Sequence, residues 1–428
     1  MMPAKMLASD GEGNVLEIAE YEVLAKSGPF IYHIEDEDLI PLPEGSDIFE
    51  LKGRRPIGYN RITGTVEEVA QYQGTPLVAV SAFLPPAHTI THTAAFRKDA
   101  DAPTLPLFAY SPLGWKEGGY VTTAVRVDMD RRQEPALFDR ERLERLAMTM
   151  LSDRRENRLI EHLVENCALR YSCPAAMNYV FGRWEMPVPT SPVCNARCVG
   201  CISSQPEGGF PSTQERIEFI PTASEIVEAA VEHIKRAQNP IVSFGQGCEG
   251  EPLLVAGLIE EALRGIRRQT GDGTLNLNTN GSLPGEVEKL VDAGLSSIRV
   301  SMNSARAEYY RRYHRPSGYG FEDVVETIRI AKAGGAFVSI NCLLFPGFTD
   351  LPSEVEAMEE LVRSLRVDMI QWRNLNIDPD LYMEVIDQPD ERGMGISRMI
   401  RKFEAEIPDL CHGYFNPYLC DGAGKHDP

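Results

Sequence analysis

The sequence predicts an α/β protein in which an open, partial (β/α)6 barrel follows a β-rich N-terminal domain, and three observations support this. After Arg183, short apolar stretches alternate with amphipathic stretches of helical period. Up to about residue 130, alternating and β-branched stretches such as VLEIAEYEVL and GYVTTAVRVD are divided by Pro and Gly. Between these regions, apolar residues from Leu143 to Val164 recur at helical spacing.

The repeated region predicts six strands and six helices. The strands are expected near EMPVPTS, NPIVSFG, TLNLNTN, SIRVSMN, AFVSINCLLF and DMIQWRN, and the helices near 222–238, 253–269, 284–293, 305–314, 320–334 and 353–366. Parallel strands need right-handed crossovers, so the helices should cover the outside of the sheet. Six strands are too few for a closed eight-fold barrel, which predicts an open TIM-like barrel with a short C-terminal tail.

The change of pattern along the chain predicts four regions. A β-rich N-terminal domain is expected over 1–133, and a helical linker over 134–183. The partial barrel is expected over 184–382, followed by a C-terminal extension over 383–428. A chain of 428 residues exceeds the usual size of one domain, which agrees with this division.

Composition and charge narrow the class of protein. Hydrophobic residues make up 43% and charged residues 25% of the sequence, as in an ordinary globular protein. No basic patch precedes an apolar run, and no 18 uncharged apolar residues occur together, so we expect a cytoplasmic protein without a membrane segment. The formal charge of −20 disfavours nucleic acid as a partner, because an acidic surface repels phosphate groups.

Polar residues occupy one face of several predicted strands. Side chains alternate between the two faces of a strand, so Asn276, Asn278 and Asn280 should share a face. The same alternation groups Arg299, Ser301 and Asn303 on the fourth strand, Ser339 and Asn341 on the fifth, and Gln371 and Arg373 on the sixth. Buried amide and guanidinium groups cost free energy unless they are paired, which predicts water or a polar ligand inside the barrel.

Three cysteines stand close together in CNARCVGC, directly after the first predicted barrel strand: Cys194, Cys198 and Cys201. A structural zinc site uses four ligands, and no second cysteine or histidine pair lies nearby in the sequence. A [4Fe-4S] cluster held by three thiolates instead keeps one iron open. Both interpretations stay open from the residues alone, and the missing fourth ligand favours the cluster.

The same eight residues resemble the CxxxCxxC loop of radical SAM enzymes. In that family, three cysteines hold a [4Fe-4S] cluster whose fourth iron chelates the amino and carboxylate groups of S-adenosylmethionine (SAM). The place of the loop after the first strand and the number of β/α units agree with the family. The resemblance covers approximately residues 185–380 and does not extend to the N-terminal domain.

Further segments are similar to the SAM-binding elements of the family: FGQGCEGEP, SMNS, YYRRYHRPSG and LLFPGFTD. The residues so implied are Gly250, Glu251 and Pro252 for the SAM ammonium, Ser301 and Asn303 for the ribose, Arg312 or Arg315 for the carboxylate, and Phe345, Pro346 and Gly347 for the adenine. Two positions depart from the family pattern. Glu249 stands where the family usually has Gly, and Gly200 stands where many members have an aromatic residue.

The resemblance implies a chemistry as well as a fold. The reduced cluster of the family gives one electron to the SAM sulfonium, and the 5′-deoxyadenosyl radical that results removes hydrogen from a substrate. This implies an electron donor such as a flavodoxin or ferredoxin. Sites in such barrels lie at the carboxyl ends of the strands, so the substrate is expected to meet Asn278, Asn280, Arg299, Gln371, Arg373 and Asn374.

Four further cysteines flank the predicted barrel: Cys167, Cys173, Cys411 and Cys420. Some radical SAM enzymes carry an auxiliary [4Fe-4S] cluster, and four thiolates would suffice for one. Their spacings match no ferredoxin motif, so unrelated thiols are the alternative. Cys248 and Cys342 are expected to be core residues.

Three functions remain open from the sequence. The first is a radical SAM enzyme that acts on a peptide or a small organic molecule, and the acidic charge favours it. The second is a radical SAM enzyme that modifies RNA. The third is a non-catalytic structural metal protein, which Glu251, Ser301 and Asn303 argue against because such a site needs no cofactor-binding groups.

Overall fold

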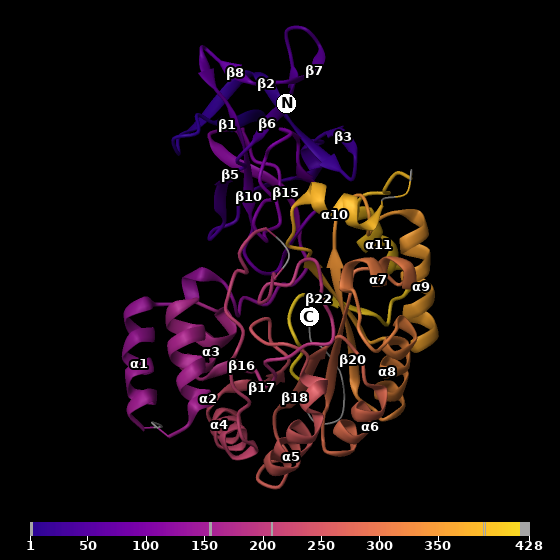
Figure 1. Ribbon diagram of the computed structural model, residues 1–428. Helices are drawn as coiled ribbons and strands as arrows, with labels where there is room; N and C mark the ends of the chain where they lie inside the picture. The colour runs from indigo at the N-terminus through magenta and orange to yellow at the C-terminus, as the bar shows by residue number, and fades with distance from the viewer. Residues whose placement is uncertain (1–2, 154–155, 207–208, 388, 390, 420–428) are drawn as a thin grey trace.

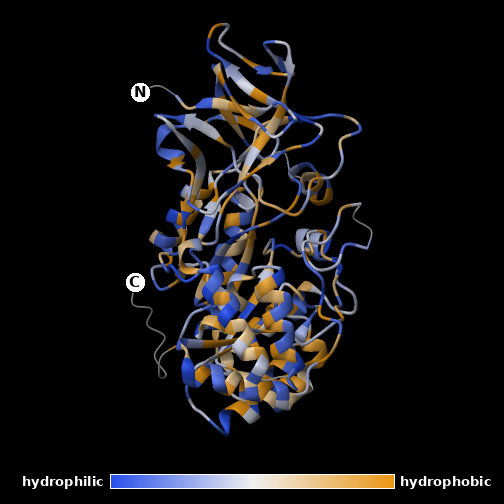
Figure 2. Cartoon of the chain, turned by 90° about the vertical axis from the view of Figure 1, so that its left-hand side faces the viewer, coloured by the Kyte–Doolittle hydropathy of each residue, from blue (hydrophilic) through white to orange (hydrophobic). Residues whose placement is uncertain are grey.

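The structure is a computed structural model, and it describes residues 3–153, 156–206, 209–387, 389 and 391–419. A β-rich domain stands on an α/β barrel, and the linker helices pack beside the barrel (Figure 1). In the view turned by 90°, hydrophilic and hydrophobic residues alternate along the barrel helices (Figure 2). No helix within these ranges has both the length and the apolar character needed to cross a membrane.

The N-terminal domain contains a 13-stranded sheet in which every described strand pair is antiparallel. Its strands are β1 (Lys5–Ser9), β2 (Val15–Ser27), β3 (Phe30–His33), β4 (Leu39–Pro41), β5 (Asp47–Glu50), β6 (Arg54–Asn60), β7 (Thr65–Glu68), β10 (Val78–Phe83), β11 (His88–Ile90), β12 (Thr93–Ala94), β13 (Phe96–Lys98), β14 (Gly114–Lys116) and β15 (Gly119–Arg126). A small separate ladder joins β8 (Gln71–Tyr72) to β9 (Thr75–Pro76), and one 3₁₀ turn, η1, spans Asp36–Asp38. The β-rich character expected of this region is confirmed.

A helical segment joins the two parts. It consists of the 3₁₀ turn η2 (Pro135–Leu137), α1 (Arg140–Asp153), α2 (Arg158–Glu161), the π-helix η3 (His162–Arg170) and α3 (Pro174–Phe181). Asn157 caps α2 through its side chain, which accepts a hydrogen bond from the backbone of Ile160. Gly182 ends α3 in the left-handed conformation, with φ of 70°, which glycine adopts at little cost.

The second sheet is parallel and open, with the strands in sequence order from β16 to β22. Its strands are β16 (Arg183–Val188), β17 (Gln238–Phe244), β18 (Thr274–Thr279), β19 (Ser297–Met302), β20 (Phe337–Leu344), β21 (Met369–Asn374) and β22 (Cys411–Gly413). The helical elements that accompany it are α4 (Ala223–Arg236), η4 (Pro252–Val255), α5 (Ala256–Arg267), α6 (Pro284–Asp292), α7 (Ala307–His314), α8 (Phe321–Ala333), α9 (Pro352–Leu365), α10 (Pro379–Ile386) and α11 (Ile396–Glu406). The six expected strands and the partial barrel are confirmed, and β22 is a seventh strand that the sequence pattern did not reveal.

The two faces of the parallel sheet separate as the period-two pattern predicts. Residues with apolar side chains, such as Leu277, Ile298 and Ile340, are fully buried in the large core beneath the helices. The register aligns Asn278 with Arg299, and Ser301 with Asn341, on the other face. The apolar core therefore lies outside the sheet, and the barrel interior is polar.

The N-terminal domain sits on the carboxyl ends of the barrel strands. The hydroxyl of Thr89 donates to the carbonyl oxygen of Trp372 at 2.6 Å. The Nδ2 atom of Asn374 donates to the backbone oxygen of His88, and its Oδ1 atom accepts from the backbone nitrogen of Ile90, both at 2.9 Å. In addition, Arg54 and Asp378 form a fully buried ion pair at 2.7 Å. The N-terminal domain thus covers the end of the barrel where sites of such folds lie.

Candidate functional site: three cysteines at the end of the barrel

The three cysteines follow β16 on a loop at the carboxyl end of the parallel sheet. Cys194, Cys198 and Cys201 are half-buried and line one cavity of about 350 Å³. Thr104 of the N-terminal domain and Arg216 and Arg315 from the barrel side also line it. With Arg197 of the cysteine loop itself, the cavity joins the thiols to three arginines and to the covering domain.

The end of α7 holds the cysteine loop in place through backbone hydrogen bonds. The amide nitrogen of Val199 donates to the oxygen of Tyr313 at 3.0 Å, and that of Arg197 donates to the oxygen of His314 at 3.1 Å. The amide nitrogen of Ser317 donates in turn to the oxygen of Asn195 at 2.8 Å. The loop is thus fixed by a segment more than a hundred residues away in the chain.

The thiols of the loop are spaced more widely than the ligands of a single ion. Among the described residues, the three sulfur atoms do not converge within the 4.8 Å that one shared ion would need. A cube in which each thiolate binds a different iron accepts such wider spacing. Burial raises the pKa of Cys194 to about 11 and that of Cys198 well above its usual value, and a bound cation would favour the thiolate form of both. The donor set fits a [4Fe-4S] cluster.

Polar groups approach two of these sulfur atoms. The Nδ1 atom of His314 lies 3.4 Å from the sulfur of Cys198, and Nη2 of Arg216 lies 3.6 Å from the sulfur of Cys201. Hydrogen bonds to cluster sulfurs are one of the factors that set the reduction potential of such clusters. Sequence reasoning did not single out either residue: the loop that carries Arg216 matches no motif, and in YYRRYHRPSG only the arginines were assigned a role.

The Gly250–Pro252 segment lies directly against the residues that precede Cys194. The amide nitrogen of Gly250 donates to the oxygen of Ser191 at 2.6 Å, and that of Glu251 donates to the oxygen of Val193 at 2.8 Å. A Cβ atom at Gly250 would lie 1.9 Å from the oxygen of Val193, which only glycine avoids. Pro252 begins the 3₁₀ turn η4.

Two buried glutamates hold neighbouring strand ends together. The carboxylate of Glu251 accepts hydrogen bonds from the hydroxyl of Thr279 and from the backbone nitrogen of Asn280. Glu249, at the position that departs from the family pattern, accepts from the backbone nitrogens of Thr190 and Ser191 at 2.7 and 2.9 Å. Burial raises the pKa of each glutamate to about 7, and this effect outweighs that of the hydrogen bonds, which lower the pKa.

The space that the missing aromatic residue would occupy at Gly200 is taken by Tyr313. A Cβ atom at position 200 would lie 2.7 Å from the hydroxyl oxygen of Tyr313, a buried side chain of α7. The two features fit each other, since the glycine leaves room for the ring.

Ser301 and Asn303 lie on the lumen side of β19 and just after it. The amide of Asn341 donates to the hydroxyl of Ser301 at 2.9 Å. The amide of Asn303 donates to the hydroxyl of Tyr382 at 3.2 Å, while its Oδ1 atom is buried without a hydrogen-bond partner. That oxygen is an acceptor that a hydroxyl group of a ligand would satisfy.

The two candidate arginines of the α7 region lie in different surroundings. Arg315, which ends α7 in the left-handed conformation, lines the cavity of the three cysteines. Arg312 donates to the oxygen of Ile386 at 2.7 Å and pairs with Glu308 at 2.8 Å. Of the two, Arg315 is therefore the arginine that is placed to contact a carboxylate in the cavity.

The Phe345–Gly347 segment is enclosed by protein. Phe345 packs with Tyr382 at 4.7 Å between ring centroids, inside a small core cluster. The amide nitrogen of Gly28 donates to the oxygen of Pro346 at 3.1 Å, and a Cβ atom at Gly347 would lie 1.9 Å from the nitrogen of Gly28. The N-terminal domain therefore packs against this segment through the turn between β2 and β3.

Most of the expected substrate-contacting residues line the barrel interior. Asn278 donates to the oxygen of Gly245 at 2.7 Å, and Asn280 donates to the side chain of Asn195 in the cysteine loop at 2.8 Å. Arg299 donates to Gln371 at 3.2 Å. By contrast, the amide of Asn374 is already used by the backbone of the N-terminal domain.

A segment that follows β22 fills part of the polar interior. The Nδ2 atom of Asn416 lies 2.8 Å from Glu185, 3.0 Å from Ser243 and 3.3 Å from Asn278. The amide of Gln371 donates to Oδ1 of Asn416 at 3.2 Å. The chain itself thus supplies part of the polar content expected inside the barrel, and no local pattern marked Asn416 for this position.

The flanking cysteines lie in different parts of the fold. Cys167 and Cys173 belong to the linker, and Cys411 lies in β22, at the other edge of the sheet order. Cys420 is outside the described residues. Cys167 lies close to His162 and to Cys248, which the sequence placed in the core.

Comparison with known proteins gives three kinds of match. The family model described as the Radical SAM superfamily matches residues 188–362. GTP 3′,8-cyclase of Erythrobacter litoralis is 28% identical over 173 residues, which cover 38% of this chain and 47% of the relative. The FeMo cofactor biosynthesis protein NifB of Klebsiella pneumoniae is 29% identical over 183 residues, which cover 39% of this chain and 38% of the relative. Methylornithine synthase (PylB) matches as a structure with 15% identity and a TM-score of 0.39, over 64% of this chain and 71% of that chain. The chain thus spans about half or less of the length of the two curated relatives.

Proposed function

Residues 188–362 form a radical SAM domain, and from that premise we propose that the chain cleaves SAM reductively and removes hydrogen from a peptide or a small organic substrate. The observation that carries the proposal is the convergence of Cys194, Cys198 and Cys201 on one cavity of about 350 Å³ at the carboxyl end of the barrel. A closed structural site would have no use for that space. Radical SAM domains use a [4Fe-4S] cluster and SAM as cofactors.

The residues of the chain have distinct tasks in this proposal. Cys194, Cys198 and Cys201 hold the cluster, and Arg315 meets the SAM carboxylate from the cavity wall. When bound, the cluster and SAM supply one-electron reduction and hydrogen abstraction. The N-terminal domain excludes water from the barrel end, since it contacts Asn374 at the end of β21 and Asp378, the residue that caps α10.

The barrel interior favours a substrate with an anionic group. Arg299 and Arg373 both project from the polar face, and burial together with the charge of Arg373 lowers the pKa of Arg299 to about 9. The Nε atom of Arg299 is buried without a hydrogen-bond partner. A carboxylate or phosphate between the two guanidinium groups would offset their repulsion and satisfy that donor. GTP, which appears in the name of the relative from Erythrobacter litoralis, is one such anion.

The proposal also requires an external electron donor. Reductive cleavage consumes one electron per SAM molecule, and a flavodoxin or ferredoxin is the class of protein that delivers it. RNA is the less favoured substrate, because the chain carries a formal charge of −20.

Reconstitution tests the cofactor part of the proposal. The chain is loaded anaerobically with iron and sulfide, and its iron content, its EPR signal with and without SAM, and its release of 5′-deoxyadenosine under dithionite are measured. We expect about four irons per chain and a signal that SAM changes. Cys198→Ala should lose most of the iron and all 5′-deoxyadenosine release, whereas Cys342→Ala, in the core beneath the helices, should keep both. Full SAM cleavage by Cys198→Ala would overturn the assignment.

A second assay tests the substrate class. Release of 5′-deoxyadenosine by the loaded enzyme is measured in separate reactions that contain GTP, amino acids, short peptides or tRNA, and the amounts released are compared. Stimulation by an anionic small molecule or peptide, lost in Arg373→Met and kept in the control Arg306→Gln, is the expected result. Arg306 pairs with Glu354 outside the lumen, so its removal leaves the interior charges unchanged. Stimulation by tRNA alone would contradict the choice of substrate.

A further inference from the structure

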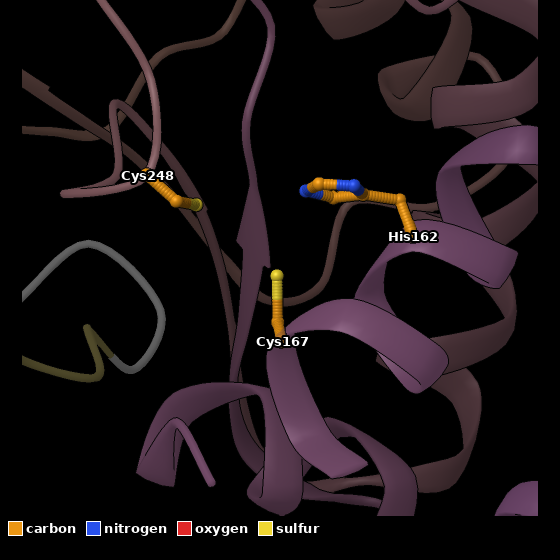
Figure 3. Close-up of side chains that lie close together, drawn as sticks. All are labelled: His162, Cys167 and Cys248. Carbon is orange, nitrogen blue, oxygen red and sulfur yellow. The ribbon is translucent and has the colours of Figure 1, made fainter. Parts of the chain in front are cut away.

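Three side chains from two distant segments meet in a second place outside the cysteine loop (Figure 3). The ligand atoms of His162, Cys167 and Cys248 all lie within 4.8 Å of one another, and no other group of three His, Cys, Asp or Glu residues does so in the described part of the chain. From this geometry we propose that these three residues bind one zinc ion. The site is separate from the radical SAM cofactors, and the proposal does not depend on the function assigned above.

The π-helix η3 brings two of the ligands onto one face. His162 and Cys167 are five residues apart, which on a regular α-helix would separate them by about 140° around the axis. In a π-helix, hydrogen bonds run between residues five apart, as the bond from the nitrogen of Tyr171 to the oxygen of Asn166 at 3.1 Å shows. This wider winding brings residues five apart onto the same side of the helix. Such helices are rare, and those known are frequently at functional sites.

The third ligand comes from the turn between β17 and η4. Cys248 points from this turn toward the helix, and its backbone oxygen accepts a hydrogen bond from Ile217 at 2.8 Å. The ring of His162 points toward the two sulfur atoms, as Figure 3 shows. Its Nε2 atom is buried without a hydrogen-bond partner, which is an independent sign of a missing ligand. The edge of the same ring packs against Phe219 at 5.9 Å between centroids, which fixes its orientation.

The ligand types and their spacing favour a single zinc ion. Zinc binds thiolate sulfur at about 2.3 Å and imidazole nitrogen at about 2.0–2.1 Å, so tetrahedral neighbours lie about 3.5–4 Å apart. A group of atoms within 4.8 Å matches that size, while an iron–sulfur cube needs its ligands further apart. Two thiolates and one imidazole are a known zinc ligand set with the fourth position open to water. Cys173 lies outside this group, so we assign the fourth position to water.

The proposed ion would connect the linker to the loops around the cysteine cavity. Cys248 directly precedes Glu249, whose carboxylate accepts hydrogen bonds from Thr190 and Ser191 ahead of Cys194. A metal bond to Cys248 therefore restrains the segment that anchors the cysteine loop. In this way the helical linker would stabilise the radical site without contacting it.

The test is the metal content of the full-length protein, measured as zinc and iron separately by mass spectrometry. We expect about one zinc per wild-type chain before iron is added. Cys167→Ser and Cys248→Ser should each lose at least four-fifths of it, while Cys342→Ser and Cys198→Ala should keep it. Cys198→Ala should lose iron instead, so the two sites separate. Zinc that survives Cys248→Ser, or that disappears with Cys198→Ala, would overturn the proposal.

A measurement on the wild-type chain covers the case in which the variants do not fold. The zinc is exchanged for cobalt(II), and the absorption spectrum is recorded. Thiolate-to-cobalt charge-transfer bands and the intense d–d bands of a tetrahedral ion are expected. His162→Gln should shift these bands while it leaves the circular dichroism spectrum unchanged. An octahedral spectrum, or a disulfide between Cys167 and Cys248 in anaerobically purified protein, would refute the site.

Discussion

The contact between Gly250 and the cysteine loop gives a prediction whose size follows from the structure. In Gly250→Ala, the new Cβ atom would lie 1.9 Å from the oxygen and 2.3 Å from the carbonyl carbon of Val193. Both are backbone atoms, so no side chain can rotate away, and the residues before Cys194 must move. That movement breaks the hydrogen bonds from Gly250 to Ser191 and from Glu251 to Val193.

Two costs add up in this variant. Overpacking in a well-packed site costs about 1–3 kcal/mol, and the two lost hydrogen bonds cost about 1 kcal/mol each. The free energy of unfolding should therefore fall by about 3–5 kcal/mol, a large part of the stability of a typical domain. Because the strain falls on the cysteine loop, the reconstituted chain should also bind less iron.

Urea denaturation and iron counting together check this prediction. Gly257→Ala is the matched control, since a Cβ atom there meets nothing within 4 Å and Gly257 lies in α5. Alanine is the better helix former by up to about 1 kcal/mol, so the control should be neutral or slightly more stable. A Gly250→Ala chain with unchanged stability and full iron content would refute the steric argument.

Three further predictions concern the contacts that hold the parts of the fold together. Arg54→Met should lower the free energy of unfolding by about 3–5 kcal/mol, because the carboxylate of Asp378 is left buried without a counter-charge. If the double variant Arg54→Met with Asp378→Asn recovers no stability, the uncompensated charge is not the cause. Asn416→Ala should cost about 1–3 kcal/mol in urea denaturation, since Glu185 and Gln371 lose a buried partner; an unchanged urea midpoint would contradict this. Burial lowers the pKa of His233 and His412 to about 4, below the ordinary 6.5, so the unfolded chain binds more protons at these two sites and their contribution to stability should decline as the pH falls from about 6.5 to about 4, while Glu249 and Glu251, whose pKa burial raises to about 7, contribute with the opposite sign. His233→Gln should flatten that decline, and an equally steep decline in the variant would rule out His233.

The sequence predicted the barrel because local patterns determine it. Strands such as TLNLNT and SIRVSM show a period of two, and the same period separates the apolar core from the polar interior. The cysteine loop was visible because its three residues lie within eight positions of one another. These features depend on neighbours along the chain, which is why they can be predicted without a structure.

The tertiary structure alone decided which distant segments meet. Asn416 lies far along the chain from Glu185, and Cys248 lies far from Cys167, yet each pair is in contact or close proximity. The seventh strand, β22, has only three residues, too few for a period to show. The docking of the N-terminal domain on Asn374 and Asp378 likewise depends on long-range packing. Hydrophobic patterning fixes which face of an element is buried, but it does not specify the partner, because apolar contacts are not directional.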